Sequence, residues 1–265
     1  MPLPTTSTQL RQLGKRLAKG TEISDADFDL LARVLAAYQD ALDLAEKRLR
    51  RLGYPVATRV KTTGTLVQKL RREPSMPLKS VQDVAGARIV VDDGWPGQDA
   101  VVERIVTEFA DGSRKPAPRD RRAEPSCGYR AVHVVVYVAD LPVEIQVRTE
   151  LQDAWAQIVE KLGDRWGRGL RYGEGPERPD DPVEGVDPPL TRSELFDKLL
   201  RISERIHEVE DVGAQLAEVK ARAIELGHEC DGAVLRQCDA LSERLHGHED
   251  RLRATVEALT GWMTS

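Results

Sequence analysis

The chain has 265 residues, enough for one substantial domain with an appendage or for two small domains. Hydrophobic residues make up 40% of the chain and charged residues 31%, which favours a soluble protein with long exposed helices. The net charge of −5 provides no overall attraction to nucleic acid or to anionic membranes.

Three scattered cysteines are too few for a disulfide framework. The N-terminal segment lacks the apolar stretch of a signal peptide, and no run of residues approaches the length of a membrane-spanning helix. We therefore expect a cytoplasmic protein that has no membrane partner.

Local charge departs from the acidic average in two places. Between Arg59 and Lys79 there are six Lys and Arg against one acid, and between Asp111 and Arg122 there are five against two. Both runs flank predicted core strands. They therefore indicate a site for a polyanion rather than a generally basic protein.

A helix is expected near the N-terminus, because Ser24 and Asp27 form a capping-box pattern and apolar residues follow at helical spacing to about Leu52. Gly53 and Pro55 then end it. Further along the chain we expect a strand at 56–62, a helix at 65–72, a buried strand at 87–91, a helix at 99–109, a polar loop at 111–125, a two-stranded hairpin at 128–149 and a helix at 151–166. This alternation predicts an α+β domain, a mixed α/β sheet with helices packed on it.

Residues 167–190 contain ten Gly and Pro and six acids, which is typical of a linker or an irregular loop. Thr191 and Glu194 then form a capping box, and apolar residues follow at three- and four-residue spacing. We expect two long helices folded into a hairpin, whose apolar seams also suit contact with another subunit. The predicted divisions are N-terminal helices at 1–55, a core at 56–166, the linker at 167–190 and the hairpin at 191–265.

The strand hairpin at 128–149 carries polar residues in register. Strand side chains alternate between faces, so three apolar residues should share one face of the second strand: Val143, Ile145 and Val147. Three polar residues should share its other face: Glu144, Gln146 and Arg148. In the first strand we expect Tyr129 and His133 on one face and valines on the other, with the turn near Leu141 and Pro142. An antiparallel sheet with one solvated face gives the same alternation, so this pattern alone leaves both interpretations open.

Cations and a hydroxyl surround the start of the predicted helix at 65–72. Arg59 and Lys61 share a strand face, while Thr65 and Lys69 share a helix face. This arrangement suits a cradle for phosphate groups at a helix N-terminus. The alternative is a solvated basic surface.

Asp83 precedes the predicted buried strand, and Gly86 and Arg88 follow it. A carboxylate in this place suits a metal-binding acid at the edge of a sheet. Taken alone, Asp83 is better explained as a cap of a helix or turn.

Four patterns occur in order along the chain: R-x-K-x3-T-x3-K from Arg59, DVAGAR from Asp83, GYRAVH from Gly128 and VEIQVRT from Val143. Together they resemble the synthetase domain of the RelA/SpoT family, over roughly residues 57–166. The family usually carries Ser where this chain has Thr65, which keeps the hydroxyl. The resemblance implies a nucleotidyltransferase-like (polymerase-β-like) fold and a small, synthetase-only member, because only 58 residues precede the first pattern and no His-Asp pair occurs in them.

The resemblance also implies an activity, the transfer of pyrophosphate from ATP to the 3′-hydroxyl of GDP or GTP, which makes (p)ppGpp and releases AMP. By position, Arg59 and Arg88 would sandwich the adenine ring, as guanidinium planes are able to do. The phosphates of ATP would be held by Lys61, Thr65 and Lys69. A Mg²⁺ cofactor would bind to Asp83 and Glu144, and Glu144 would also take the proton of the attacking hydroxyl. Tyr129 would stack on the acceptor base, and the residues that align donor and acceptor would be His133, Gln146 and Arg148.

The chain departs from the family just before Gly128, where members often show DY-x-x-P-K-x-N-GY. Arg121 stands for the aromatic residue, Ser126 for the lysine and Cys127 for the asparagine. Arginines nearby, Arg121 and Arg122 among them, either compensate in binding the acceptor or accommodate a larger anion.

Three readings of the function therefore stay open, and the synthesis of (p)ppGpp is the first of them. A toxin-type relative would place pyrophosphate on the 3′ end of tRNA, or would make adenosine alarmones, and phosphate contacts by arginine suit a tRNA partner. An inactive nucleotide-binding scaffold is the third reading, against which the two carboxylates Asp83 and Glu144 argue. We also expect a homo-oligomer formed through the C-terminal helices.

Overall fold

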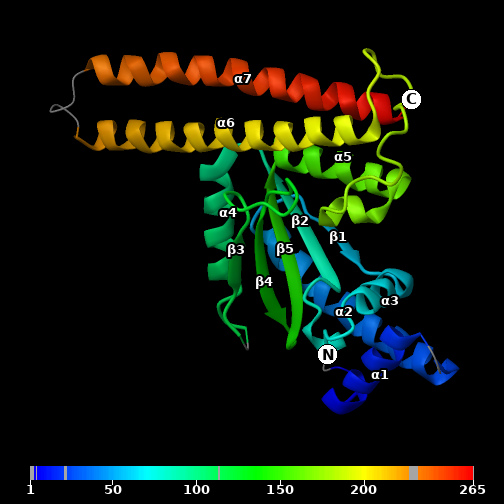
Figure 1. Ribbon diagram of the computed structural model, residues 1–265. Coiled ribbons are helices and arrows are strands. Elements are labelled where there is room, and N and C mark those ends of the chain that lie inside the picture. Colours follow the sequence, from blue (N-terminus) through cyan, green and yellow to red (C-terminus); the bar gives the residue numbers. More distant parts are fainter. Residues whose placement is uncertain (1–2, 4, 21–22, 113, 227–231, 265) are drawn as a thin grey trace. The chain divides into compact units, whose positions relative to one another are not determined.

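The computed structural model describes residue 3 and residues 5–20, 23–112, 114–226 and 232–264. Its elements (Figure 1) are α1 (Ser7–Lys19), α2 (Asp25–Arg51), β1 (Ala57–Val60), α3 (Thr63–Arg72), the 3₁₀ helix η1 (Leu78–Ser80), β2 (Ala85–Val91), α4 (Gly94–Glu108), β3 (Ala117–Asp120), β4 (Val132–Val138), β5 (Leu141–Thr149), α5 (Glu150–Trp166), the 3₁₀ helix η2 (Arg168–Tyr172), α6 (Arg192–Leu226) and α7 (Gly232–Thr264). Among the described residues, no helix combines the length and the apolar character that crossing a membrane requires.

Two capping boxes define the N-terminal helices. Thr6 caps α1 together with Gln9, and Ser24 caps α2 together with Asp27, as the sequence predicted for α2. The carboxylate of Asp27 also forms an ion pair of 2.6 Å with the guanidinium group of Arg16 in α1, and this pair links the two helices. The predicted end of α2 near Leu52 is confirmed.

The strands form one five-stranded sheet in the order β1-β2-β5-β4-β3, which confirms the predicted α+β class. β1 runs antiparallel to β2, with Arg59 opposite Gly86. The prediction of a loop over 111–125 was wrong in part, because this stretch contains β3. β3 lies at an edge of the sheet, has four exposed residues and includes Pro118, so it lacks the apolar alternation that reveals most strands.

A tight turn joins β4 and β5. Ala139 and Asp140 have φ values of 49° and 65°, as in the two-residue turns that fit the twist of a hairpin. The turn therefore precedes Leu141 and Pro142, which belong to β5. β4 begins only at Val132 and is buried along most of its length, so Tyr129 is not a strand residue, and a single solvated face does not describe β4.

The chain divides into two compact units, and each is described by itself. The first unit contains residues 1–89, 101–119 and 133–147, with α1, α2, β1, α3 and the greater part of the sheet. The second unit contains residues 90–100, 120–132 and 148–265, with α5, α6 and α7. The divisions predicted from the sequence composition remain a prediction.

A hydrophobic core in the second unit lies among α5, α6 and α7. Trp155 of α5 is buried in it, and its indole nitrogen donates a hydrogen bond to the carbonyl oxygen of Leu199 in α6 at 2.7 Å. The stretch at 167–190 contains η2 and contributes Leu170 and Val183 to the core. It is thus a packed, largely irregular segment rather than a free linker.

The predicted helical hairpin is confirmed, since α6 and α7 lie side by side (Figure 1). The capping box of Thr191 and Glu194 starts α6. An ion pair of 2.7 Å between Lys220 and Asp239 links the two helices. The sequence also predicts an interruption of the helical pattern at Gly227, which lies outside the described residues.

Candidate functional site

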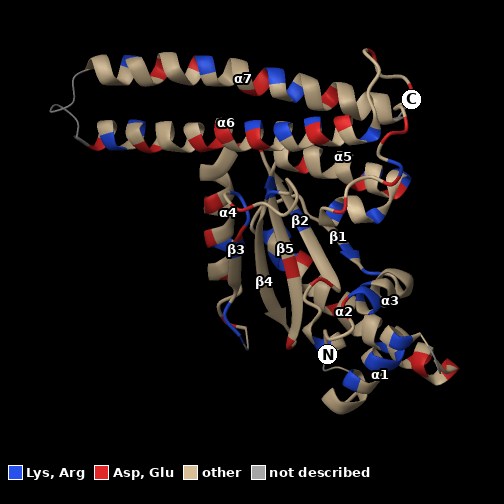
Figure 2. Ribbon diagram, in the orientation of Figure 1, with Lys and Arg blue, Asp and Glu red and all other residues tan. Residues whose placement is uncertain are grey.

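Basic residues gather on β1 and α3 of the first unit (Figure 2). Thr62 caps α3: its hydroxyl oxygen accepts a hydrogen bond from the backbone N–H of Thr65 at 3.3 Å. The Thr65 hydroxyl donates in turn to the carbonyl oxygen of Thr62 at 3.0 Å. This places Thr65 in the first turn of α3, where free backbone N–H groups and the helix dipole favour anions.

Asp83 is held by the two lysines that the sequence pattern grouped with it. Its carboxylate oxygens lie 3.2 Å from Nζ of Lys61 and 2.9 Å from Nζ of Lys69. All three side chains are largely shielded from solvent, with exposed fractions of 18–29%. The structure therefore joins the predicted phosphate cradle to the predicted metal-binding acid.

Glu144 lies on β5, next to β2 in the sheet. One of its carboxylate oxygens is 3.2 Å from Nδ1 of His133 on β4, and the other accepts a hydrogen bond from the amide of Gln146 at 3.0 Å. The alternation predicted for β5 is confirmed, because Val143, Ile145 and Val147 are fully buried. Three predicted site residues thus meet on one side of the sheet.

Burial alone would raise the pKa of Glu144. The hydrogen bonds and charges of His133, Gln146 and Lys69 have a larger effect in the opposite direction, so the pKa falls below its ordinary value, to about 2. The carboxyl group is therefore ionised at neutral pH. Lys69 acts on both predicted metal ligands, since it pairs with Asp83 and also stabilises the charge of Glu144.

Gly86 lies on β2, the strand between β1, which carries Arg59, and β5, which carries Glu144. It pairs with Arg59 of β1, and a Cβ atom at Gly86 would lie 3.7 Å from the backbone oxygen of Glu144. Arg59, Gly86 and Glu144 thus form a row across three adjacent strands. Because Gly86 has no side chain, the sheet surface stays open between the arginine and the carboxylate.

Arg59 and Arg88 are diagonal neighbours on β1 and β2, since Arg88 pairs with Ala57. Diagonal positions on one face of an antiparallel pair are roughly 7–8 Å apart. This is about twice the contact distance of roughly 3.5–4.0 Å between packed carbon atoms. The spacing therefore suits a flat ring held between two guanidinium planes.

A metal site made by the protein alone is not found in the described part of the chain, where no group of three or more His, Cys, Asp and Glu is placed to hold an ion. Asp83 and Glu144 are instead two hard oxygen donors, and Glu144 is ionised. Mg²⁺ is typically bound by one or two carboxylates together with waters and substrate phosphates. The donor set fits that ion.

Tyr129 lies in the second unit, in a turn that begins at Ser126. The backbone N–H of Tyr129 donates to the carbonyl oxygen of Ser126 at 3.0 Å, and Cys127 and Gly128 between them have φ values of 52° and 79°. Both central residues are therefore left-handed, which Asn-Gly adopts most readily. Cys127 stands where the family resemblance places asparagine, so the turn is kept with a less suitable residue.

Arg148 fixes the ring of Tyr129. Its guanidinium carbon lies 5.0 Å from the ring centre, and one of its nitrogens donates to the Tyr129 hydroxyl at 3.1 Å. The ion pair with Asp153 of α5, at 2.9 Å, holds the guanidinium in turn. Asp153 was not among the predicted site residues, although its position one helical turn after Thr149, the N-cap of α5, is a signal in the sequence.

The two arginines before the turn differ in their surroundings. Arg122 is paired with Asp99 at 2.7 Å and with Asp120 at 2.6 Å, and it lies over the ring of Trp95. Arg121 is half-buried, and its backbone N–H donates to the carbonyl oxygen of Ala131. The guanidinium group of Arg122 is thus already neutralised by carboxylates of the chain itself.

Comparison with known proteins agrees with this geometry. Residues 58–163 match the family described as "Region found in RelA / SpoT proteins". The chain thus contains a RelA/SpoT region. The matched segment contains all the predicted site residues that lie in the first unit, from Arg59 to Gln146.

Two curated relatives of the chain are mycobacterial proteins that are described as uncharacterized. The uncharacterized protein Rv1366 of Mycobacterium tuberculosis (strain ATCC 25618 / H37Rv) is 37% identical over 180 residues, 66% of this chain and 65% of the relative. The uncharacterized protein Mb1401 of Mycobacterium bovis gives the same values. The chain therefore spans 65% of the length of these curated relatives.

Solved structures show the same nucleotidyltransferase-like fold. The small alarmone synthetase 1 from Bacillus subtilis is 25% identical, with a TM-score of 0.52 over 74% of this chain and 99% of that one. The same protein bound to its product pppGpp gives a TM-score of 0.53 at 24% identity, over 72% of this chain and 97% of that one.

The depressed pKa of Glu144 predicts how the stability of the protein depends on pH. A carboxyl group with a folded pKa of about 2 and an ordinary value of 4.5 stabilises the folded state above pH 4.5, and this contribution is lost as the pH falls toward 2. The shift corresponds to about 3 kcal/mol. Urea unfolding between pH 2 and 6 should show that the Glu144→Gln variant lacks this part of the dependence. Parallel curves for the two proteins would contradict the assigned pKa.

Cys127 predicts a stabilising substitution within the RelA/SpoT region. Asparagine tolerates the left-handed backbone better than other non-glycine residues, so Cys127→Asn should raise the free energy of unfolding by roughly 0.5–1 kcal/mol. The midpoint of urea unfolding at an unchanged slope measures this. Cys127→Ser is the matched control and should give no such gain, because serine lacks that preference.

Proposed function

We propose that the protein transfers pyrophosphate from ATP to the 3′-hydroxyl of GDP or GTP, which makes (p)ppGpp and releases AMP. The observation that carries the proposal is a pair of carboxylates: Asp83, in the turn before β2, and Glu144, on the adjacent strand β5. Lys61 and Lys69 both pair with Asp83, and Lys69 also stabilises the charge of Glu144. The match of residues 58–163 to the region found in RelA/SpoT proteins supports it. The small alarmone synthetase of similar fold, whose product is pppGpp, adds support at the level of substrate class.

The first unit supplies the residues that we assign to ATP. Arg59 and Arg88, as diagonal neighbours, hold the adenine ring between their guanidinium planes. Lys61 and Lys69 bind the phosphates, and the N-terminal turn of α3 around Thr65 completes the cradle. Charge neutralisation and positioning are what phosphoryl-type transfer requires most.

Asp83 and Glu144 are the residues that would hold Mg²⁺, together with phosphate oxygens of the substrate. Bound there, the ion would supply charge neutralisation on the transferred group. Both lysines leave Asp83 for the phosphates when ATP is bound, because phosphate oxygens carry more charge than one carboxylate.

Glu144 is assigned as the group that accepts the proton of the attacking 3′-hydroxyl. Its ionised carboxylate has an oxygen to accept that proton, and His133 and Gln146 fix its orientation. The 3′-oxygen forms a bond to the β-phosphorus of ATP as the bond breaks between that phosphorus and the oxygen that bridges it to the α-phosphorus. The bridging oxygen stays with AMP, and the proton passes from Glu144 to water.

The acceptor nucleotide is assigned to Tyr129, whose ring serves as a stacking platform, and to Arg148, which fixes that ring. The segment before the Tyr129 turn, residues 120–125, is called the lead-in, and it contains Arg121, which we assign to acceptor phosphates. Arg122 contributes indirectly, since its guanidinium is paired with Asp99 and Asp120. His133 and Gln146 align the reacting groups through Glu144.

Label transfer tests the proposal. The protein is incubated with Mg²⁺ and ATP labelled at the γ-phosphate, together with GDP, GTP, GMP, ADP or tRNA in separate reactions. We expect label on GDP or GTP, AMP in equal amount, and no transfer when Mg²⁺ is chelated. Label on tRNA or on an adenine nucleotide alone would replace the proposal by the toxin-type alternative. ATP binding without AMP release for any acceptor would support the inactive scaffold.

We also propose that the protein is a homo-oligomer formed through its C-terminal helices. Apolar side chains with exposed fractions of 50–62% lie along α6 and α7: Val212, Val219, Ile224 and Leu241. A second copy of the same hairpin would cover them. Light scattering coupled to gel filtration should show a mass that is a multiple of 29.5 kDa, and Val219→Glu with Leu241→Glu should reduce it to one chain. A single chain in the wild-type protein would overturn this assignment.

A further inference from the structure

One face of α6 carries polar residues where a helix of a hairpin is expected to be apolar. Ser203, His207 and Glu210 follow one another at i, i+4 and i+7, so they lie on the same face. Ser203 and Glu210 are only 2% and 5% exposed. Buried polar groups are costly unless they are hydrogen-bonded, so the partners of this face show what it does.

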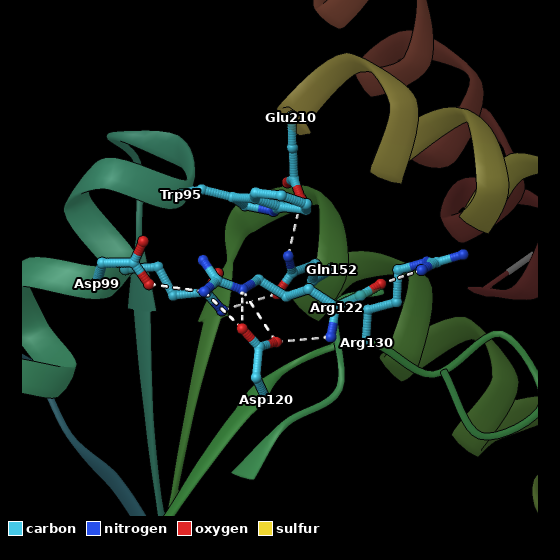
Figure 3. A network of polar contacts seen from close by, with 8 residues as sticks. Trp95, Asp99, Asp120, Arg122, Arg130, Gln152 and Glu210 are labelled. Atoms are coloured by element: carbon cyan, nitrogen blue, oxygen red, sulfur yellow. Dashed lines mark hydrogen bonds and ion pairs between the residues drawn. The ribbon is translucent and has the colours of Figure 1, made fainter. Parts of the chain in front are cut away.

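Glu210 accepts hydrogen bonds from three donors of the second unit, two of which, Trp95 and Gln152, are labelled in Figure 3. The Thr149 hydroxyl donates to one carboxylate oxygen, and the other accepts from Nε2 of Gln152 at 2.7 Å and from Nε1 of Trp95 at 2.9 Å. Thr149 and Gln152 are the two members of the capping box that starts α5. A carboxylate of α6 therefore completes the N-terminal cap of another helix.

The residue before this cap is Arg148, which contacts the ring and the hydroxyl of Tyr129. Arg148 is also paired with Asp153 in the first turns of α5. The direction in which Arg148 points therefore depends on how α5 begins, and Glu210 holds that beginning in place.

Ser203 acts on the other side of Tyr129. Its hydroxyl donates to the carbonyl oxygen of Gly128 at 2.5 Å and accepts from Nε of Arg130 at 3.1 Å. Arg130 is also paired with Glu204 at 2.8 Å and donates to the carbonyl oxygen of Arg122. The residues immediately before and after Tyr129 are thus both bound to the same hydroxyl of α6.

Trp95, which donates to Glu210, also contacts the segment that precedes the Tyr129 turn (Figure 3). Its ring contacts Arg122, whose guanidinium carbon is 4.8 Å from the ring centre, and also His207, whose ring centre is 5.3 Å away. Arg122 belongs to the lead-in of the Tyr129 turn. The polar face of α6 thereby fixes the lead-in, the turn and the start of α5 together.

We propose that Glu210 and Ser203 are positioning residues of the acceptor subsite, which set the placement of Arg148 and Tyr129 and through them the affinity for the acceptor nucleotide. This inference rests on the proposed function, since it takes Tyr129 as the platform for the acceptor base. α6 is on this view part of the subsite as well as part of an interface with another subunit.

Steady-state kinetics on the full chain tests the proposal. Glu210→Gln keeps the volume of the side chain but turns an amide N–H₂ toward groups that are themselves donors, and Ser203→Ala removes the hydroxyl shared by Gly128 and Arg130. Each variant should raise KM for GDP about tenfold, the factor that loss of one buried hydrogen bond to a charged group produces. KM for ATP should change less than twofold. The matched control Glu208→Gln changes an exposed carboxylate of the same helix and should leave both values unchanged.

A merely structural role would give a different result. Loss of folded protein lowers kcat in proportion to the folded fraction and leaves both KM values as they are, and thermal unfolding reports that fraction. Unchanged KM for GDP in both variants, or equal rises in KM for GDP and ATP, would overturn the inference while leaving the proposed function intact.

Calorimetric binding of GDP separates failure of the inference from failure of the proposed function. If the wild-type protein binds GDP but transfers no label to any acceptor, the proposed function is wrong, and a tenfold weaker binding in Glu210→Gln would still support the inference. If the wild-type protein neither transfers label nor binds GDP, both are overturned.

Discussion

Glu144→Gln should lower the rate of pyrophosphate transfer at least about a thousandfold at saturating substrates. General bases contribute roughly 10²–10⁴-fold, and this substitution also removes the charge of a proposed metal ligand. The amide keeps the size of the side chain, so the position of Gln146 and His133 should be preserved. Formation of AMP from ATP in the presence of GDP measures the rate.

Glu103→Gln provides the control, because Glu103 is an exposed carboxylate of α4 within the same compact unit. Its rate should equal that of the wild-type protein. A Glu144→Gln protein that unfolds cooperatively, binds ATP and still turns over within tenfold of the wild-type rate would remove Glu144 from the catalytic assignment.

Gly128→Ala should cost about 3 kcal/mol or more of the free energy of unfolding. Gly128 has a φ of 79°, which is unfavourable for alanine, and the new Cβ would lie 2.7 Å from a ring carbon of Trp155. This ring has little freedom to move, since it is 2% exposed and its nitrogen is bonded to the backbone of Leu199. Chemical denaturation of the variant measures the loss.

Gly53→Ala separates backbone strain from steric overlap. Gly53 has a φ of 93°, and a Cβ atom there would have nothing within 4 Å. This variant should therefore lose only about 1 kcal/mol, the cost of the left-handed backbone alone. Equal losses in the two variants would mean that the contact with Trp155 does not hold the Tyr129 turn.

Local patterns in the sequence were sufficient for several features of the fold. The capping boxes at Ser24 and Thr191 mark the starts of α2 and α6, since a cap depends on residues three positions apart. Alternation in β5 gave the correct face for Glu144 and Gln146, because β5 is buried on one face along this stretch. These signals arise within a single helix or strand, and a single sequence records them.

Other features depend on partners that are distant in the sequence. Arg122 belongs to a basic run, yet Asp99, more than twenty residues away, neutralises it. Glu210 lies 61 residues from Thr149, and nothing in the pattern of α6 reveals that pairing. β4 is buried on both faces, so its valines do not alternate with polar residues. The pattern therefore did not reveal that the strand begins only at Val132, after Tyr129. Tertiary contacts decide such residues.

Lys69 is, in effect, a tethered counter-ion. Its ammonium group neutralises Asp83 and stabilises the charge of Glu144, so a divalent cation arriving alone must compete with a positive charge that the chain cannot release into solution. A nucleotide removes this competition, because its phosphates give the ammonium group another place to bind. In the proposed function, binding of Mg²⁺ and binding of nucleotide would therefore be thermodynamically linked, and the carboxylate pair would discriminate against free cations without any selective cage of ligands.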